Sequence, residues 1–184
     1  MLLIGKCVGG DEKAETPAVD TVDVSTNAEI EPSTSSKEAE EISWEEETET
    51  DEMRGTTNVW NYIVSDNRVD FDFPYNGGSA MRIDVRYMKQ YGTDVILTIS
   101  KGQFSGSAYS GDNYVNIKFD NGAIKKYYFN EPADASSDYI FLRKKSELIK
   151  SFSTAHDIMI EAPFFQAGRR VFKFHVDKPL KWKH

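Results

Sequence analysis

The chain has 184 residues and a formal net charge of −8, and its composition changes sharply near residue 56. Residues 11–55 hold sixteen Asp or Glu against three basic residues, whereas residues 56–184 hold fourteen acidic and eighteen basic ones. The basic excess of the second part is too small for a nucleic-acid-binding domain, and no stretch approaches the roughly twenty apolar residues that cross a bilayer.

The first ten residues contain the one cysteine of the chain, which excludes an intramolecular disulfide. Ile4 and Gly5 lie three and two positions before Cys7, an arrangement that resembles the end of a bacterial lipoprotein signal peptide. Lys6 departs from that pattern, and the apolar stretch is shorter than the roughly 7–15 residues of a signal peptide. Two alternatives stay open: a lipoprotein anchor that starts upstream, with Cys7 as the lipidation site, or a cytosolic N-terminus with an exposed thiol.

The acidic segment, residues 11–55, is rich in Glu, Ser, Thr, Ala and Asp, and its large apolar residues are scattered. Such a composition cannot bury enough apolar surface to offset a backbone ordering cost of roughly 1–2 kcal/mol per residue. The run from Glu38 to Glu52 also repels itself. We therefore predict a disordered acidic linker over residues 11–55, in which Trp44 is a solvated residue; the alternative is that Trp44 is a short docking element.

Period-two alternation, the pattern of half-buried strands, dominates residues 56–184. It predicts strands over residues 58–64, 81–88, 95–100, 114–120, 123–129, 139–142, 158–160 and 171–176. Trp60, Tyr62 and Val64 share one face of the first strand, and Val115, Ile117 and Phe119 are expected to point inward. The Asn-Gly pair at residues 121–122 predicts a tight hairpin, because both turn positions tolerate positive φ.

One short helix is expected, because Leu148, Ile149 and Phe152 fall at helical spacing and Ser146 or a neighbour is placed to cap the first turn. Short strands, tight turns and one helix predict a mainly β (α+β) domain over residues 56–184, an antiparallel β-sandwich or a barrel-like structure. Pro163 is followed by Phe164 and Phe165, for which core packing is preferred over an exposed apolar contact.

The sequence offers little for catalysis. His156 and Asp157 precede a predicted strand, with Ser151 and Ser153 nearby, but the nucleophile elbow of a Ser–His–Asp hydrolase is absent. A hydrolase that uses His156 and Asp157 is therefore the lesser alternative to a role in loop capping. Cysteine pairs, paired histidines, calcium loops and phosphate-binding loops are absent from the sequence, so neither a metal site nor a cofactor is predicted.

Two basic groups are candidates for binding an anionic partner. They are Arg143, Lys144 and Lys145 at the start of the helix, and Arg169 and Arg170 at a turn. With Lys125 and Lys126 they would form a basic face for an anionic partner or for the acidic segment of this chain. The alternative is a solvated polar edge that discourages strand-to-strand aggregation.

Several short motifs in residues 60–182 carry a family resemblance. In chain order they are Trp60 with Asp66, Arg86, Lys118-Phe119-Asp120, Ser136-Ser137-Asp138 with Phe141-Leu142, Glu161-Ala162-Pro163-Phe164, Gly168 to Phe174, and Leu180-Lys181-Trp182. The segment is similar to type VI secretion accessory proteins and, more distantly, to invasion-associated B-like proteins. The cysteines that pair in some relatives are absent, and Lys178-Pro179 departs from the usual final glycine. The resemblance implies an exported, non-catalytic, β-rich domain and no active site.

These observations predict a non-catalytic extracytoplasmic binding domain on a flexible tether, in the form of a bacterial envelope lipoprotein that contacts the membrane only through a lipid anchor on Cys7. Its expected partner is another protein or an envelope component rather than nucleic acid. The alternative is a cytosolic regulatory protein whose acidic arm, residues 11–55, competes for the basic face.

Overall fold

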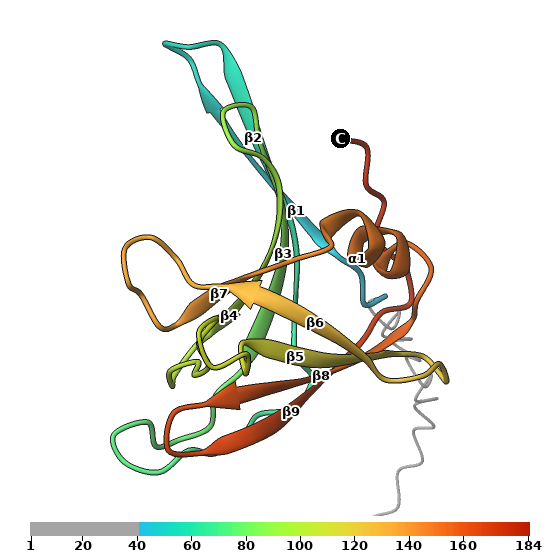
Figure 1. The fold of residues 1–184 in the computed structure, drawn as a ribbon. Helices are drawn as coiled ribbons and strands as arrows, with labels where there is room; N and C mark the ends of the chain where they lie inside the picture. Colours follow the sequence, from blue (N-terminus) through green and yellow to red (C-terminus); the bar gives the residue numbers. More distant parts are fainter. Residues whose placement is uncertain (1–40) are drawn as a thin grey trace, which may run out of the picture. The chain divides into compact units, whose positions relative to one another are not determined.

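A computed structural model describes residues 41–184, which form nine strands and one helix (Figure 1). The elements in chain order are β1 (Glu45–Asp51), β2 (Thr56–Val64), β3 (Met81–Met88), β4 (Gly92–Ile99), β5 (Tyr114–Phe119), β6 (Lys125–Asn130), β7 (Tyr139–Leu142), α1 (Lys145–Phe152), β8 (Asp157–Phe164) and β9 (Gly168–His175). No helix in this part of the chain is long and apolar enough to cross a membrane.

The strands form one antiparallel sheet in the order β1-β2-β3-β4-β7-β6-β5-β8-β9. The segment after β2 closes this sheet onto β9. The Asp66 N–H donates to the Lys173 carbonyl at 2.8 Å, the Lys173 N–H donates to Oδ1 of Asn67 at 2.7 Å, and Nδ2 of Asn67 donates to the Val171 carbonyl at 3.0 Å. The mainly β, antiparallel prediction with one short helix is confirmed, and of its two alternatives the structure is barrel-like.

The interior follows the predicted alternation of apolar residues. Val115 and Ile117 of β5 are fully buried, as expected, and Met81, Ile83 and Val85 fill the same core from β3. On β2 the shared face of Trp60, Tyr62 and Val64 is the outer one, because Val59, Asn61 and Ile63 are the buried residues of that strand. Alternation alone gives the two faces of a strand but does not say which of them is covered.

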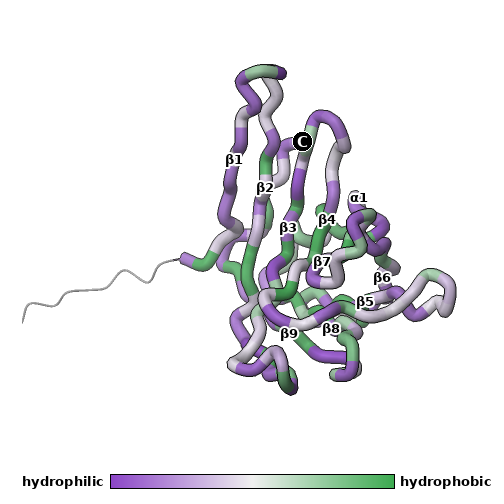
Figure 2. The backbone as a smooth tube through the Cα atoms, turned by 90° about the vertical axis from the view of Figure 1, so that its left-hand side faces the viewer, coloured by the Kyte–Doolittle hydropathy of each residue, from purple (hydrophilic) through white to green (hydrophobic). Residues whose placement is uncertain are grey.

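The predicted end of the disordered linker, at residue 55, is wrong, because part of that segment belongs to the sheet. Residues 45–51 form β1, which pairs with β2 along its whole length from Glu45–Tyr62 to Asp51–Thr56. β1 is an exposed edge strand, drawn hydrophilic along most of its length in Figure 2, and its glutamates suit an edge that must not pair with another chain. Composition failed here because an edge strand gains its order from backbone pairing and needs few apolar side chains of its own.

Trp44 is a docking residue, so the expectation that it is solvated is wrong. Its ring lies 5.3 Å from that of Phe152 and packs against the core. Ile42, two residues before Trp44, is also held in place. Its N–H donates to Oδ2 of Asp177 at 2.8 Å, and the Asp177 N–H donates to the Ile42 carbonyl at 2.8 Å. Ordered structure therefore begins well before residue 56. The rest of the predicted linker and the anchor segment with Cys7 lie outside the described residues.

α1 follows β7 and precedes β8 in the chain, and it buries Leu148 and Phe152. Lys144, in the left-handed conformation at φ 57°, occupies the N-cap position without a side-chain capping bond, so Ser146 does not cap this helix. The Tyr127 hydroxyl donates to Oε1 of Glu147 at 2.9 Å and ties α1 to β6. Burial, together with this hydrogen bond, raises the pKa of Tyr127 to about 12.

Candidate functional site at the loop end of the barrel

Four connections meet at one end of the barrel, which we call the loop end. Because every neighbouring pair of strands is antiparallel, the connections β2–β3, β4–β5, β6–β7 and β8–β9 all emerge on the same side (Figure 1). They comprise residues 65–80, 100–113, 131–138 and 165–167. The connections on the other side are short turns, apart from the one that contains α1. Long loops on a rigid scaffold are where binding residues concentrate.

A cluster of phenylalanine rings closes the barrel at this end. The Phe164 ring centroid lies 5.0 Å from that of Phe71, 5.0 Å from that of Phe104 and 5.8 Å from that of Phe172. All four side chains are buried. The rings fill the barrel end, so a ligand would bind on top of this aromatic floor rather than inside the barrel.

Backbone hydrogen bonds hold the loops to one another. The Phe104 N–H donates to the Ser137 carbonyl at 2.7 Å, and the Phe165 N–H donates to the Gln103 carbonyl at 2.9 Å. The Ser79 hydroxyl donates to the Lys101 carbonyl at 2.6 Å, which joins the β2–β3 loop to the β4–β5 loop. The loop end is thus cross-linked in the free protein and requires little ordering when a partner binds.

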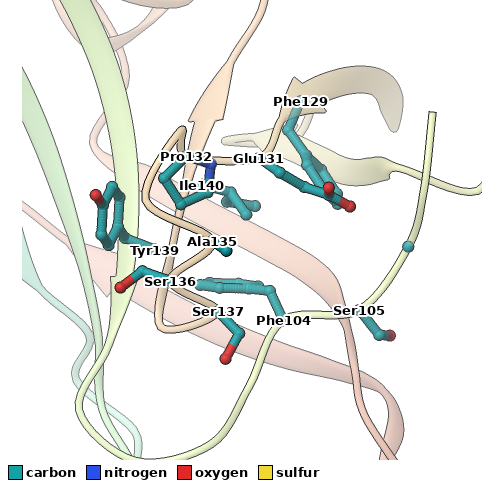
Figure 3. A pocket seen from close by; sticks show the side chains of 11 residues that line it. Phe104, Ser105, Phe129, Glu131, Pro132, Ala135, Ser136, Ser137, Tyr139 and Ile140 are labelled. Carbon is teal, nitrogen blue, oxygen red and sulfur yellow. The ribbon is translucent and has the colours of Figure 1, made fainter.

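The first of two hollows at the loop end, the Phe104 pocket, is lined by Phe104 and by residues of the β4–β5 and β6–β7 connections (Figure 3). Its volume is about 170 Å³, its apolar lining comes chiefly from Phe104, Phe129, Pro132 and Ile140, and serine side chains stand at its rim. Glu131 is the one charged residue that lines it. A hollow of this size admits a single side chain or a small group, since drug-sized ligands occupy roughly 300–1,000 Å³.

The second hollow, the Phe71 pocket, is lined by Phe71 and Phe164 of the ring cluster and has a volume of about 260 Å³. The β2–β3, β4–β5 and β8–β9 connections line it: Phe71, Asp72, Phe73, Pro74, Tyr75, Gly102, Gln103, Phe164, Phe165, Gln166 and Ala167. Phe73 is 85% exposed and Phe165 is 60% exposed, so both rings stand at the rim in water. The adjacent Phe164 is buried, so the expectation of core packing holds for Phe164 and fails for Phe165.

The loop end is acidic. Its four loops carry seven carboxylates and two basic side chains: Asp66, Asp70, Asp72, Asp112, Glu131, Asp134 and Asp138 against Arg68 and Lys101. Hydrogen bonds from the Ser110 hydroxyl and the Ser107 backbone lower the pKa of Asp112, and bonds from the Ser136 N–H and the Tyr139 hydroxyl lower that of Asp134. The excess of negative charge at the loop end favours a positively charged partner.

Gly106, which lines the Phe104 pocket, is required by the close approach of the backbone there. At its φ of +115°, a Cβ atom would lie 2.9 Å from the Asp112 carbonyl oxygen and 3.1 Å from Cα of Asn113. Gly106→Ala is expected to lower the free energy of unfolding by roughly 1–3 kcal/mol, since strain is added to a clash with backbone. Urea unfolding followed by circular dichroism measures the loss. Gly111→Ala is the control: its φ is also positive, at +72°, but no atom lies within 4 Å of the added Cβ, so equal losses would contradict the role of the clash.

The first predicted basic group is engaged by its neighbours. Nε of Arg143 donates to Oδ1 of Asn130 at 2.9 Å, and Nζ of Lys145 lies 3.3 Å from Oδ1 of Asp94. Nζ of Lys144 lies 3.7 Å from the carboxylate of Glu147, which its own helix supplies. Two of the three cations therefore already have carboxylate partners within the domain.

In the second basic group, Arg169 is engaged by neighbouring side chains and Arg170 is exposed. Nε of Arg169 donates to Oε2 of Glu161 at 2.9 Å, and its guanidinium lies 4.4 Å from the centroid of the Tyr114 ring. Nζ of Lys126 lies 3.9 Å from the centroid of that ring. Arg170 is exposed, and its Nη1 donates to the Arg169 carbonyl at 3.3 Å. Binding of an anionic partner at these residues stays a prediction.

The hydrolase constellation is not assembled. Nδ1 of His156 lies 2.9 Å from the Val176 carbonyl oxygen, whereas Asp157 faces His175 instead, with Oδ1 2.7 Å from Nδ1 of that ring. The hydroxyls of Ser151 and Ser153 donate to carbonyls of α1. Histidine, aspartate and serine therefore do not converge as a nucleophilic triad requires.

His175 gives a test of the geometry at β8 and β9. The hydrogen bond to Asp157 raises the pKa of His175 above its usual value, and the charge of Asp177 adds to this effect. The protonated ring favours the folded state, so its contribution to stability is present below the unfolded pKa of about 6.5 and is lost as the pH rises through the folded pKa. In an NMR titration, Asp157→Asn is expected to lower the His175 pKa and Asp138→Asn to leave it unchanged; an unchanged pKa in Asp157→Asn would contradict this pairing.

Among residues 41–184, no group of three His, Cys, Asp or Glu side chains is arranged to hold a metal ion. Cys7, the proposed lipidation site, lies outside the residues that the structure describes.

Comparison with known proteins supplies no relative. No family model, curated protein or solved structure matches this chain. The resemblance to type VI secretion accessory proteins and invasion-associated B-like proteins therefore stays a prediction that rests on short sequence motifs. The loop end was missed by sequence reasoning, although Phe71-Asp72-Phe73-Pro74-Tyr75 before two glycines is a signal for an aromatic loop.

Proposed function

We propose that residues 41–184 form a non-catalytic binding domain whose partner is another protein that docks on the loop end. The observation that carries this proposal is the pair of exposed rings, Phe73 and Phe165, at the rim of a formed pocket. Isolated apolar side chains are common on protein surfaces, but these two flank one concave surface on loops that are tied together.

The size of the hollows favours a protein partner over a cofactor. Volumes of about 170 and 260 Å³ hold one side chain each, and aromatic residues beside such hollows are typical of the anchoring centre of protein interfaces. The four loops of the loop end carry seven carboxylates against two bases, and this excess of negative charge orients an approaching positively charged partner.

Site-specific crosslinking in the native host, followed by affinity measurement, tests this proposal. A photoreactive phenylalanine at position 165 is expected to form a discrete adduct with one partner, and the same residue at exposed Tyr91 in the β3–β4 turn is not. With that partner purified, Phe73→Ala/Phe165→Ala is expected to weaken binding at least about tenfold, and Tyr91→Ala to leave it unchanged. Equal affinity for the wild type and the double variant would refute docking at the loop end.

The location that we propose is the bacterial envelope, with a lipid on Cys7. Support comes from the sequence around Cys7 and from the motifs that resemble exported proteins. Expression from the native locus with a palmitate analogue is expected to label the wild type and not Cys7→Ser. Labelling of neither form, with both in the soluble fraction, would favour the cytosolic regulatory alternative.

A further inference from the structure

We infer that the Phe71 pocket receives the cationic side chain of a lysine or arginine from the partner. This inference rests on the proposed function and adds the chemistry of the group that is bound. It is argued from the rings that line the pocket, from the charge around it and from its size.

Aromatic residues make up nearly half of the lining of the Phe71 pocket, five of its eleven residues. Phe71, Phe73, Tyr75 and Phe165 reach it from two loops that lie about ninety residues apart in the sequence. The face of an aromatic ring attracts an organic cation through its quadrupole, and sites built from several rings are used to hold ammonium groups. A neutral apolar side chain would gain from burial against these rings, but it would not use the charge described next.

Asp72 is the one charged residue that lines the Phe71 pocket. Both bases of the loop end are engaged beside the pocket: Nζ of Lys101 donates to the Asn76 carbonyl at 2.8 Å, and the side chain of Arg68 lies against Gly78. Neither lines the pocket. A carboxylate beside aromatic rings, within loops that carry an excess of acid, is complementary to a positive group and opposes a negative one.

The pocket also matches the shape of a long basic side chain. Its volume of about 260 Å³ exceeds that of the Phe104 pocket, and the exposed rings of Phe73 and Phe165 at the rim can cover the methylene stem of lysine or arginine. Gln103 and Gln166 also line it, and glutamine amide oxygens are hydrogen-bond acceptors for ammonium or guanidinium protons.

The test is an NMR titration of the full chain with Nα-acetyl-lysine N-methylamide and Nα-acetyl-arginine N-methylamide, each against its neutral isostere, the Nε-acetylated lysine or citrulline. The cationic probes are expected to shift the amide signals of residues 71–75, 102–103 and 165–167, with an affinity at least about tenfold above the neutral ones. Equal affinities for the cationic and neutral probes would overturn the inference.

Asp72→Asn and Asp70→Asn form a matched pair, since both remove one negative charge from the same loop and Asp70 does not line the pocket. Asp72→Asn is expected to lower cation affinity about tenfold and Asp70→Asn by less than about twofold; equal losses would show general charge attraction and overturn the inference. If the probes and Asp72→Asn show no effect while Phe73→Ala/Phe165→Ala still weakens partner binding, this inference fails alone. If the double variant also binds normally, the proposed function fails as well.

Discussion

Phe164→Ala is expected to lower the free energy of unfolding by about 3–5 kcal/mol. The Phe164 side chain is 2% exposed and touches the rings of Phe71, Phe104 and Phe172. Its removal leaves a cavity between three side chains that belong to different parts of the sheet and its loops, so the site cannot collapse by moving one of them. Urea unfolding of the full chain, followed by far-ultraviolet circular dichroism, gives the loss.

Phe165→Ala is the matched control, because the same side chain is removed at the next position in the sequence. Phe165 is 60% exposed, so its removal should cost less than about 1 kcal/mol. The pair also separates stability from binding. Phe165→Ala should weaken binding of the partner, whereas Phe164→Ala should lower the free energy of unfolding. Similar losses in unfolding free energy for both variants would contradict the placement of the two rings.

The sequence was sufficient for strands β2 to β9, but not for β1, because the alternation of apolar residues in those strands has a period of two. Val115 and Ile117 illustrate this, since both were expected inside and both are fully buried. The alternation breaks at the end of β8, where Ala162, Pro163 and Phe164 are all buried, and it says nothing of Phe165, which lies beyond the strand. Alternation does not say which face of a strand is covered when both faces carry large residues. It therefore could not predict that Trp60 and Tyr62 lie on the outer face of β2.

The candidate site was beyond the reach of local patterns for a different reason. Phe71 and Phe165 line one pocket because β9 pairs with the segment after β2, and nothing in the sequence near either residue specifies that contact. The prediction of basic residues available to an anionic partner was limited for a related reason. Arg169 reads as a free cation beside Arg170, but β8 brings Glu161 to its guanidinium. Pairing across strands decides which charges remain available to a partner.

Trp44 tests where the folded domain begins. Trp44→Ala in the full chain is expected to lower the free energy of unfolding by about 2–3 kcal/mol, somewhat below the cost for a fully buried tryptophan, because the ring is partly buried against the core beside Phe152. If Trp44 were a solvated linker residue, Trp44→Ala would leave the free energy of unfolding unchanged. Met53→Ala is the control: Met53 lies in the β1–β2 turn, is 96% exposed and should leave stability unchanged.

A double-mutant cycle locates the effect of Trp44. Trp44→Leu and Phe152→Leu are expected to show a coupling energy of about 0.5–1.5 kcal/mol, the range for aromatic pairs in contact. The rings lie 5.3 Å apart at 54°, a tilted arrangement. A coupling energy near zero, together with an unchanged free energy of unfolding in Trp44→Ala, would show that residues 41–51 belong to the linker and not to the folded domain. Coupling in the expected range would show that the acidic segment contributes both an anchor and an edge strand to the domain, because Trp44 joins directly onto β1.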